Sequence, residues 1–414
     1  MDSCERRKES MKTKVTLEEA QEMLTSRVSP SPDETVPLLL AHQRILAQDI
    51  YAPIDQPPFD RSPLDGYALR AADTRGAEAA NPVHLEVIEE VCAGSCPQRE
   101  LSAGTACRIM TGAPIPKGAD CIIRQEDTCE SENRVTIIQQ LSPGENYCFK
   151  GEDIKKGSLL LKEGALLNYV GIGILASMGF REVPVYRLPK IAVLSTGDEL
   201  TDIGSALSPG KIYNSNLYTI GLRLKELGME PLLLDSAPDE LDQLCEAISA
   251  AIRNCDILIT LGGVSVGKKD LLKDAMKALG AEILFWRINM KPGTPALCSI
   301  LEGKPVISLS GNPAAAAITF ELLTRPVLSL VSHRKDIDLQ KTEALMETPY
   351  PKESSKRRML RGKLIQQDCR EFVEPGSKHS PGVLSSFSDC NCLIDIPAGT
   401  LGLEKGQKVT IFKL

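Results

Sequence analysis

The sequence predicts a multidomain α/β protein, and three observations support this fold class. The 414 residues exceed the length of one typical domain. Residues 190–330 alternate short apolar segments with amphipathic ones, which is the pattern of a parallel sheet covered by helices on both faces. Before and after this part, short β-branched segments separated by Gly, Pro and Asp indicate smaller β domains.

Helical patterns open the chain. Residues 15–28 carry the first, with Thr16 as its N-cap and Glu18 and Glu19 in the first turn, where the helix dipole favours acids. A second helical stretch covers residues 38–47. Four prolines and a D-G pair in the next stretch, residues 53–67, then break regular structure.

Short β-branched segments follow and predict a small β unit. The expected strands are 84–91, 121–125 and 134–140. A helix over residues 169–178 is expected to end at Gly179, because glycine readily adopts the left-handed conformation that closes many helices.

The α/β region is the most regular part of the chain, and an all-β region follows it. The expected strands of the α/β region are 191–194, 232–234, 256–261, 282–287 and 305–309. Its expected helices are 217–227, 239–253, 270–279 and 313–330. Beyond a polar linker after residue 332, the expected strands are 359–365, 392–396 and 408–412.

Composition limits the classes of function. The net charge of −7 at pH 7 argues against a protein that coats nucleic acid, which would usually be basic. The 13 cysteines form no C-x-x-C pair and the four histidines show no ligand spacing, so we do not expect a zinc site. No signal peptide and no membrane-spanning apolar run are evident. We therefore expect a cytoplasmic protein with free thiols and with neither a membrane nor a nucleic-acid partner.

The loop of residues 261–267 is a candidate anion site. Open α/β sheets bind ligands beyond the carboxyl ends of their strands, and Gly262, Gly263 and Gly267 would let backbone N–H groups face an anion. The loop nearly matches a P-loop, but Lys269 stands where a Ser or Thr must ligate Mg²⁺. An ATPase is therefore not expected, and the alternative to an anion site is a tight strand-to-helix turn.

Two further loops lie at predicted strand ends. Gly311 and Asn312 precede Pro313 at a helix start, where capping alone could explain them. Asp198 and Glu199 could hold Mg²⁺, or they could form a solvated turn.

Two stretches outside these loops are also unusual. Lys291, in residues 290–295, could face an oxyanion or lie in an exposed turn. Residues 59–68 combine a proline turn with two acids, and the alternative is an ordinary hairpin.

Seven stretches occur in one order over residues 59–313, and together they resemble the molybdopterin molybdenumtransferases, the family of MoeA and the gephyrin E-domain. Each stretch alone is moderately specific, whereas seven in register make a strong match. A generic nucleotide-binding sheet does not account for the first three. The stretches are FDRSPLDGYA, MTGAPIPKGAD followed by RQED, GEDI, VLSTGDEL, GGVSVG, KPGTP and SGNP.

The resemblance implies a fold. It implies a three-layer α/β domain like the molybdopterin-binding fold with a parallel-rich sheet, a helical linker domain, an inserted small β domain and a C-terminal β-barrel. It also implies a homodimer, whose active site combines the α/β and barrel domains of one subunit with the β domain of the other. The expected parts are a tail 1–12, a helical linker region 13–56 plus 143–183, a β domain 57–142, an α/β domain 184–332 and a barrel 340–414.

The resemblance also implies a reaction. The family inserts molybdenum from molybdate into adenylylated molybdopterin and releases AMP and molybdenum cofactor, with Mg²⁺ or a similar divalent cation. A molybdopterin adenylyltransferase is the implied upstream partner. Splitting a phosphoanhydride requires charge neutralisation on the phosphates and a positioned nucleophile, and the acids and glycine loops of this sequence suit that chemistry.

Residue by residue, the resemblance assigns the site. The implied catalytic acids are Asp65, Asp153, Glu199, Asp239 and Asp270. The implied metal ligands are Asp198, Glu199 and Asp270. The implied ligand-binding residues are Thr111, Gly262, Gly263, Ser265, Gly267, Lys291, Pro292, Gly293, Gly311, Asn312, Arg361 and Ser380, with Arg361 and Ser380 at the expected molybdate site.

Four positions depart from the family pattern. Thr294 replaces the second lysine of K-P-G-K-P, Ala315 replaces a serine, Ser310 replaces a common proline and Lys268 replaces a frequent acid. The first two changes remove expected oxyanion donors. A tungstate-using enzyme, a degenerate paralogue, an adenylyltransferase and a gephyrin-like scaffold therefore stay as alternatives, although an adenylyltransferase would not need residues 59–68 and a scaffold would not need intact acids.

Overall fold

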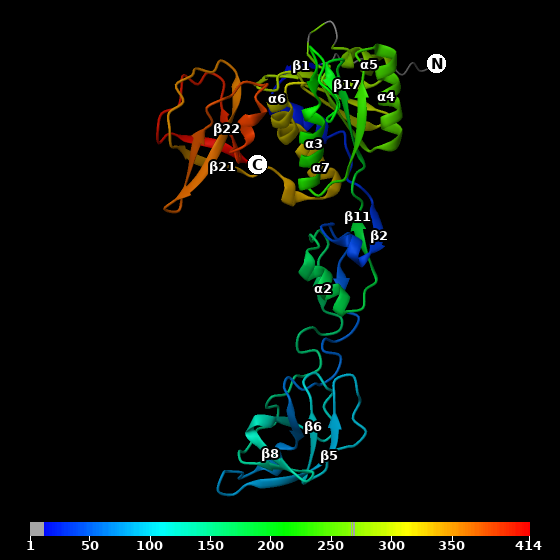
Figure 1. The fold of residues 1–414 in the computed structure, drawn as a ribbon, viewed down its shortest axis with the longest axis vertical. Coiled ribbons are helices and arrows are strands. Elements are labelled where there is room, and N and C mark those ends of the chain that lie inside the picture. The colour runs from blue at the N-terminus through cyan, green and yellow to red at the C-terminus, as the bar shows by residue number, and fades with distance from the viewer. Residues whose placement is uncertain (1–11, 266, 268–269) are drawn as a thin grey trace, which may run out of the picture. The chain divides into compact units, whose positions relative to one another are not determined.

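A computed structural model describes residues 12–265, 267 and 270–414 of the chain (Figure 1). The expected polar tail lies outside the described residues except for Lys12. The chain forms two compact units, which are treated separately below. The first comprises Met1–Glu34, Gln43–Ile45 and Val185–Leu414, and the second comprises Thr35–His42 and Leu46–Pro184. The chain passes from one unit to the other within β2 (Asp33–Pro37) and β11 (Glu182–Tyr186), and it also returns to the first unit at Gln43–Ile45.

The first unit contains a seven-stranded mixed sheet in the order β1-β17-β19-β20-β16-β12-β15. The strands are β1 (Lys12–Val15), β12 (Ile191–Thr196), β15 (Pro231–Ala237), β16 (Ile257–Leu261), β17 (Glu282–Ile288), β19 (Leu297–Leu301) and β20 (Lys304–Leu309). Helices α1, α3, α6 and α7 pack on one face, and α4 and α5 pack on the other. The expected three-layer α/β domain is therefore confirmed.

The helices of this domain have nearly the expected bounds. They are α1 (Leu17–Thr25), α3 (Ser215–Glu226), α4 (Leu241–Asn254), α5 (Leu272–Ala278), α6 (Pro313–Thr319) and α7 (Arg325–Ser332). A π-helical segment, Phe320–Thr324, joins the last two. Within the described residues, one helix, Pro313–Ser332, is long and apolar enough to cross a membrane, where the sequence predicted none. Because 83% of it is buried inside the protein, it is a core helix of this fold.

Two features of the sheet were not expected from the sequence. Strand β19 is fully buried and runs antiparallel to β17 and β20, so its residues show no alternation. Its turn to β20 uses Glu302 and Gly303, both with positive φ, rather than the Asn-Gly or Asp-Gly pair that marks such hairpins. The grouping of residues 13–56 with the helical region also differs, because β1 and α1 lie in this unit and bury Leu17, Ala20 and Leu24 in its core.

The C-terminal part of the first unit is a closed five-stranded barrel, as expected. The strands follow the order β22-β23-β21-β25-β24, and β24 pairs back with β22. They are β21 (Lys341–Met346), β22 (Arg357–Gln367), β23 (Arg370–Pro375), β24 (Cys392–Ile396) and β25 (Lys408–Lys413). The short strand β18 (Met290–Lys291) of the α/β domain pairs in parallel with β22, which brings the KPGTP segment to the barrel.

The second unit holds a six-stranded sheet in the order β7-β4-β6-β5-β9-β8 and a helical part (Figure 1). Its elements are β3 (Ile50–Tyr51), β4 (Gly66–Leu69), β5 (Val83–Val91), β6 (Thr105–Ile109), β7 (Cys121–Arg124), β8 (Thr128–Ser131), β9 (Arg134–Ile137), β10 (Leu159–Leu161) and α2 (Tyr169–Ser177). Helix α2 begins at its N-cap Asn168 and is followed by Gly179 at φ 82°, as predicted. The helix expected over residues 38–47 is only a 3₁₀ turn, Leu38–Ala41.

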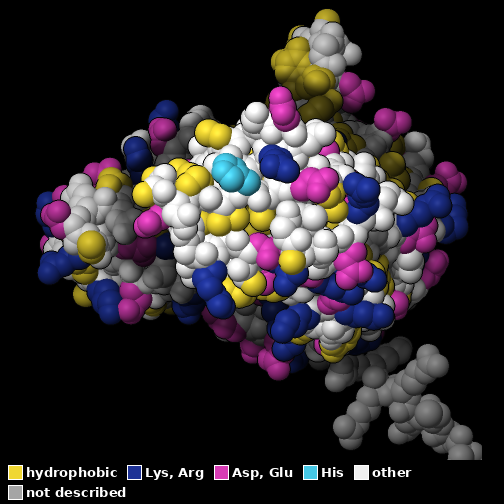
Figure 2. Space-filling model, turned by 90° about the horizontal axis from the view of Figure 1, so that it is seen from below, with side chains coloured by type: hydrophobic (Ala, Val, Ile, Leu, Met, Phe, Trp, Pro, Cys, Tyr) yellow, Lys and Arg dark blue, Asp and Glu magenta, His cyan; other side chains and the backbone are white. Residues whose placement is uncertain are grey.

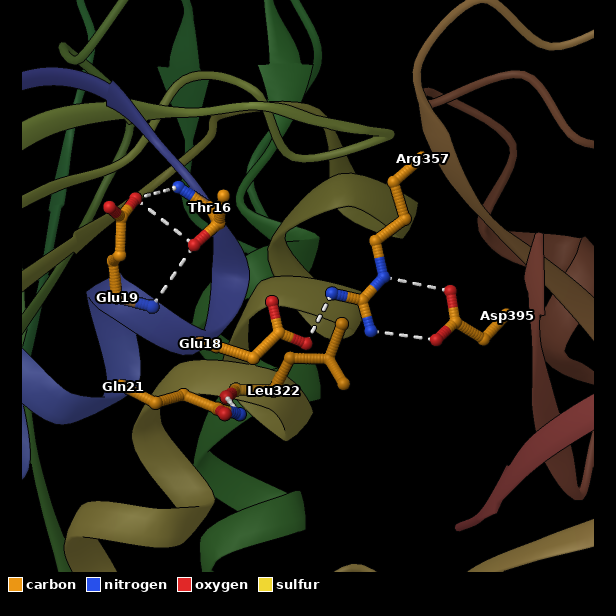
Figure 3. Close-up of polar contacts among 7 residues, drawn as sticks. All are labelled: Thr16, Glu18, Glu19, Gln21, Leu322, Arg357 and Asp395. Atoms are coloured by element: carbon orange, nitrogen blue, oxygen red, sulfur yellow. Dashed lines mark hydrogen bonds and ion pairs between the residues drawn. The ribbon is translucent and has the colours of Figure 1, made fainter. Parts of the chain in front are cut away.

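Helix α1 is tied both to its own N-terminus and to the barrel. Thr16 and Glu19 form a capping box that satisfies backbone donors at the helix start (Figure 3). Figure 3 also shows Arg357 of β22 between two acids. Its guanidinium donates to Asp395 of β24 at 2.8 and 2.7 Å and to Glu18 of α1 at 2.5 Å. One side chain therefore links the barrel to the α/β domain.

We expect Arg357→Met to lower the free energy of unfolding by about 3 kcal/mol, because it leaves the nearly buried Asp395 carboxylate without its partner. Partial burial is the largest single influence and would raise the pKa of Glu18, but the hydrogen bond from Arg357, a backbone hydrogen bond and the charges of Arg357 and Lys341 together outweigh it, so the pKa is lowered. This contribution is therefore present at neutral pH and is lost as the pH falls through the lowered pKa.

Urea unfolding at pH 7 and at pH 4 measures both effects. Lys408→Gln is a matched control, since its pair with Glu343 is mostly exposed and should contribute less than about 1 kcal/mol. Equal losses in the two variants would contradict this role of Arg357.

Candidate functional site

The glycine-rich loop after β16 lies against Thr196, the last residue of β12. Gly262 and Gly263 have φ of 100° and 64°. A Cβ at Gly262 would lie 2.5 Å from the carbonyl oxygen of Thr196, and one at Gly263 would lie 2.9 Å from the Thr196 hydroxyl. Only glycine fits this approach, so the loop begins as the sequence predicted, at the carboxyl edge of the sheet.

The second half of this loop leads into helix α5. Ser265 and Gly267 are exposed, and the Gly267 N–H donates to the carboxylate of Asp270. The indole N–H of Trp286, the single tryptophan of the chain, donates to the Val264 carbonyl at 3.2 Å. Ser265, Gly267 and Asp270 therefore lie in one loop, as expected, whereas Lys268 and Lys269 lie outside the described residues.

The loop after β20, which contains Gly311, lies against the loop after β16. A Cβ at Gly311 would lie 3.5 Å from the Gly262 Cα, and Asn216 of α3 donates to the Gly311 carbonyl at 2.8 Å. The Asn312 side chain makes no capping hydrogen bond. The N–H groups of Ala314 and Ala315 instead donate to the carbonyl of Pro381 in the barrel, at 3.0 and 3.2 Å. The expected side-chain cap is therefore replaced by a backbone oxygen.

The acids after β12 border a small cavity. Glu199 lines a space of about 50 Å³ together with Asn214, Asn216, Gly262 and Gly311. Its carboxylate lies over Gly197, where a Cβ would be 2.5 Å from Oε2. The cavity thus brings an acid from one loop beside the glycines of two others.

Asp198 and Asp239 face each other across neighbouring loops. The Asp198 N–H donates to the Asp239 carboxylate at 3.3 Å, and the Asp239 N–H donates to the Asp198 carboxylate at 3.1 Å. Among the described residues no group of three or more His, Cys, Asp or Glu side chains could hold a metal ion. The expected set Asp198, Glu199 and Asp270 therefore does not form a three-ligand metal site by itself.

A larger cavity of about 370 Å³ lies between the α/β domain and the barrel. Lys291, Pro292, Gly293, Asn312 and Ala315 line it from the α/β domain, and residues of β22 and of the loop after β23 line it from the barrel. The predicted KPGTP and SGNP segments therefore meet in one pocket. Gly293 is required there, because a Cβ would lie 2.4 Å from the Thr319 methyl group.

Arg361 and Ser380, the expected molybdate residues, are placed differently. The Arg361 side chain is fully buried, and its Nη2 donates to the carbonyls of Lys378 and Ser380 at 2.8 and 3.2 Å. Its Nε and Nη1 have no hydrogen-bond partner. Arg361 lines a second cavity of about 480 Å³ within the barrel, and neither residue lines the pocket that holds Lys291.

Asp65 and Thr111 come together in the second unit. The backbone N–H and the hydroxyl of Thr111 both donate to Oδ1 of Asp65 at 2.7 Å. These hydrogen bonds lower the pKa of the Asp65 carboxyl, so it is a carboxylate at neutral pH. Asp153 belongs to the same unit and is exposed, with its N–H donating to the Gln56 carbonyl at 3.0 Å.

Comparison with known proteins covers almost the whole chain. Family models match the MoeA N-terminal region (domain I and II) at residues 15–179, the probable molybdopterin binding domain at 192–330 and the MoeA C-terminal region (domain IV) at 343–414. A molybdopterin molybdenumtransferase of Staphylococcus aureus strain COL is 36% identical over 96% of this chain and 95% of its own length.

The chain belongs to the molybdopterin molybdenumtransferase (MoeA) family.

Further relatives support the same family. The molybdopterin molybdenumtransferase of Bacillus subtilis strain 168 is 35% identical, over 97% of this chain and 94% of its own length. The crystal structure of a molybdopterin biosynthesis MoeA protein from Pyrococcus horikoshii has a TM-score of 0.82 at 35% identity, covering 97% of this chain and 99% of that one. The MoeA resemblance seen in the motifs is therefore confirmed.

Several side chains of this MoeA site were not predicted from the sequence. Asn216 binds the Gly311 carbonyl, Trp286 holds the Val264 carbonyl, and Arg358 and His379 line the pocket of Lys291. Asn216 and Trp286 lie inside regular elements with no motif around them. A sequence signal existed only for Arg358, which lies in the basic run of residues 356–358.

Proposed function

We propose that this chain inserts molybdenum from molybdate into adenylylated molybdopterin and releases AMP and molybdenum cofactor. The observation that carries this proposal is the meeting of three glycine loops with Glu199 at one edge of the α/β sheet, beside the pocket that contains Lys291. Membership in the MoeA family supports the same enzyme class, a molybdotransferase.

The loops suit a phosphoanhydride substrate. Gly262 and Gly263 let the loop pack closely against Thr196, and backbone N–H groups of such glycine loops are suitable phosphate donors. Hydrolysis forms a bond from a water oxygen to phosphorus and breaks the bridging P–O bond, with AMP as one product. We assign to Glu199 and Asp270 the role of accepting the proton that this water loses.

We include Mg²⁺ in the proposal as a partner of the phosphates. Mg²⁺ commonly binds one or two carboxylates and completes its coordination with phosphate oxygens and water. Because the described acids form no three-ligand group, the chain alone does not fit a resident metal, and the roles assigned here do not depend on the ion.

We also propose that the enzyme is a homodimer. The edge strand β15 and helix α3 expose a run of large apolar side chains, which soluble monomers rarely leave in contact with water. The exposed fractions are 59% for Leu222, 48% for Leu232, 40% for Leu233 and 39% for Tyr218. A second copy would cover this surface and could bring its own Asp65 to the acids of the first copy.

A cytoplasmic location is proposed, with a molybdopterin adenylyltransferase as the upstream partner because that activity would make the adenylylated substrate. We propose no nucleic-acid or membrane partner. On the face drawn in Figure 2, acidic and basic side chains are interspersed rather than gathered by sign. The mixture agrees with the acidic net charge of −7 and offers no broad basic surface for a polyanion on that face.

We expect purified protein supplied with adenylylated molybdopterin, Mg²⁺ and molybdate to release AMP and to yield cofactor that activates an apo-molybdoenzyme. Chromatographic quantification of AMP measures the first product. Omitting molybdate and replacing it by tungstate are the informative controls, because faster release with tungstate would favour a tungsten enzyme. AMP at background levels with both oxyanions would refute the proposed function and leave a degenerate paralogue or a scaffold.

A further inference from the structure

The pocket between the α/β domain and the barrel places two cations on neighbouring strands. Lys291 of β18 and Arg358 of β22 are register partners in a parallel pair, and both line the cavity of about 370 Å³. Like charges on directly paired residues repel each other. Such a pair is unfavourable unless acids or a bound anion neutralise it.

Two consecutive arginines of β22 differ sharply in their partners. Arg357 is bound by the two acids Asp395 and Glu18. Within the described part of the chain, Arg358 donates to the uncharged hydroxyl of Tyr350, at 2.8 Å, and its Nε has no hydrogen-bond partner. Among the described residues, the lining of the pocket contains no Asp or Glu. The charges of Lys291 and Arg358 are therefore left for a ligand to neutralise.

The other residues of the pocket are also compatible with an anionic ligand. Thr294 carries no charge and its hydroxyl donates to the Met290 carbonyl at 2.5 Å, and the side chain of Ala315 has no donor. His379 also lines this pocket. Burial first, and then the charge of Arg361, lower the pKa of His379 to about 4, so the ring is neutral at pH 7 and keeps one N–H donor.

We propose that Arg358 is an oxyanion-binding residue of this chain and that, together with Lys291, it supplies the second positive charge that Thr294 does not provide. The inference rests on the proposed function, because it concerns the oxyanion that this enzyme would use. It assigns this charge to Arg358 because Arg358 lines the same pocket as Lys291, whereas Arg361 lines a different cavity.

Calorimetric titration of the full-length protein with sodium molybdate, and separately with sodium tungstate, tests the proposal. A charge-assisted hydrogen bond typically contributes about 1.5–3 kcal/mol, so Arg358→Gln should raise the Kd for the oxyanion about ten- to a hundredfold. Arg358→Lys should lie between the wild type and Arg358→Gln. Arg370→Gln, at an exposed arginine of the same barrel, should leave the Kd unchanged.

Kinetics provides a readout that a purely structural role would not change. In Arg358→Gln the KM for molybdate should rise in proportion to Kd, while the rate of AMP release at saturating molybdate stays within about twofold of the wild type. Circular dichroism and the melting temperature establish that each variant is folded, and Arg358→Lys serves as the folded comparison if Arg358→Gln is not.

The possible outcomes separate this inference from the proposed function. If the wild type binds neither oxyanion and releases no AMP, the proposed function fails and this inference fails with it. If the wild type is active and Arg358→Gln or Arg358→Lys binds molybdate with the wild-type Kd, the assignment of Arg358 alone is overturned. If affinity is lost only in Arg361→Gln, the oxyanion binds in the barrel cavity instead.

Discussion

Asp65→Asn is expected to reduce AMP release about a hundredfold or more while leaving the fold intact. Removing a positioned acid or base typically costs a factor of this size. The asparagine oxygen can still accept both hydrogen bonds from Thr111, at the atom that now accepts them at 2.7 Å, so the turn should keep its shape and only the charge is lost. Because these hydrogen bonds lower the pKa of Asp65, the wild-type rate should show no titration of this group near neutral pH.

A steady-state assay of AMP release, with melting temperature as the folding check, measures this effect. Asp49→Asn is a matched control, since Asp49 is also an exposed acid of the second unit that accepts a backbone N–H, from Glu163 at 2.8 Å. The control should retain wild-type turnover. Full activity in Asp65→Asn would remove this residue from the site.

Mixing two inactive variants tests whether the site is shared between subunits. If Asp65 of one copy works with Asp270 of another, mixing Asp65→Asn and Asp270→Asn proteins under conditions of subunit exchange should restore about a quarter of the wild-type activity. Random pairing makes half of the dimers mixed, and each mixed dimer contains one intact site of its two. If the mixture stays inactive although exchange is demonstrated, the shared site is wrong.

Gly262→Ala is expected to lower the free energy of unfolding by about 3 kcal/mol and to abolish AMP release. The cost combines a backbone conformation that L-residues avoid, φ 100°, with a Cβ only 2.5 Å from the Thr196 carbonyl oxygen. Two loops of the site would have to separate to admit the methyl group. Denaturant unfolding measures the stability, and the AMP assay measures the function.

Gly303→Ala isolates the backbone cost from the steric one. Gly303 has a similar positive φ of 77°, but no atom lies within 4 Å of where its Cβ would be. We expect a loss of about 1 kcal/mol with full activity. If both alanine variants lose the same stability and keep activity, the close approach of the Gly262 and Thr196 loops does not matter for the enzyme.

Local signals were sufficient to predict much of the fold. The amphipathic pattern of residues 217–227 corresponds to α3, the capping residues Thr16 and Glu19 start α1, and residues 392–396 form β24 as predicted. Strand β19 was missed because a fully buried strand has no alternation and its hairpin turn lacks the usual residue pair. Residues 38–47 were expected to be helical, but only Leu38–Ala41 form a 3₁₀ turn, in which Leu39 and Leu40 are exposed.

For the site, spacing along the chain identified loops but not the contacts between them. Asp65 and Thr111 are 46 residues apart, and antiparallel pairing of β4 with β6 brings them within hydrogen-bond distance. Arg361 was expected at the oxyanion pocket, yet Arg358 lines that pocket and Arg361 lines a different cavity. The resemblance gave the right strand, and the structure shows which of its arginines lines the pocket.

The sequence by itself determined the family, the order of the domains and the glycines and acids of the loops, because these depend on residue types at short spacing. The tertiary structure decided which cations remain without acids, how the N–H groups at the start of α6 are satisfied and which residues share a cavity. Those properties arise from pairing between distant segments, as between Lys291 and Arg358 or Pro381 and Ala314. The free energy of such contacts depends on distance and burial, which the order of residues along a chain does not specify.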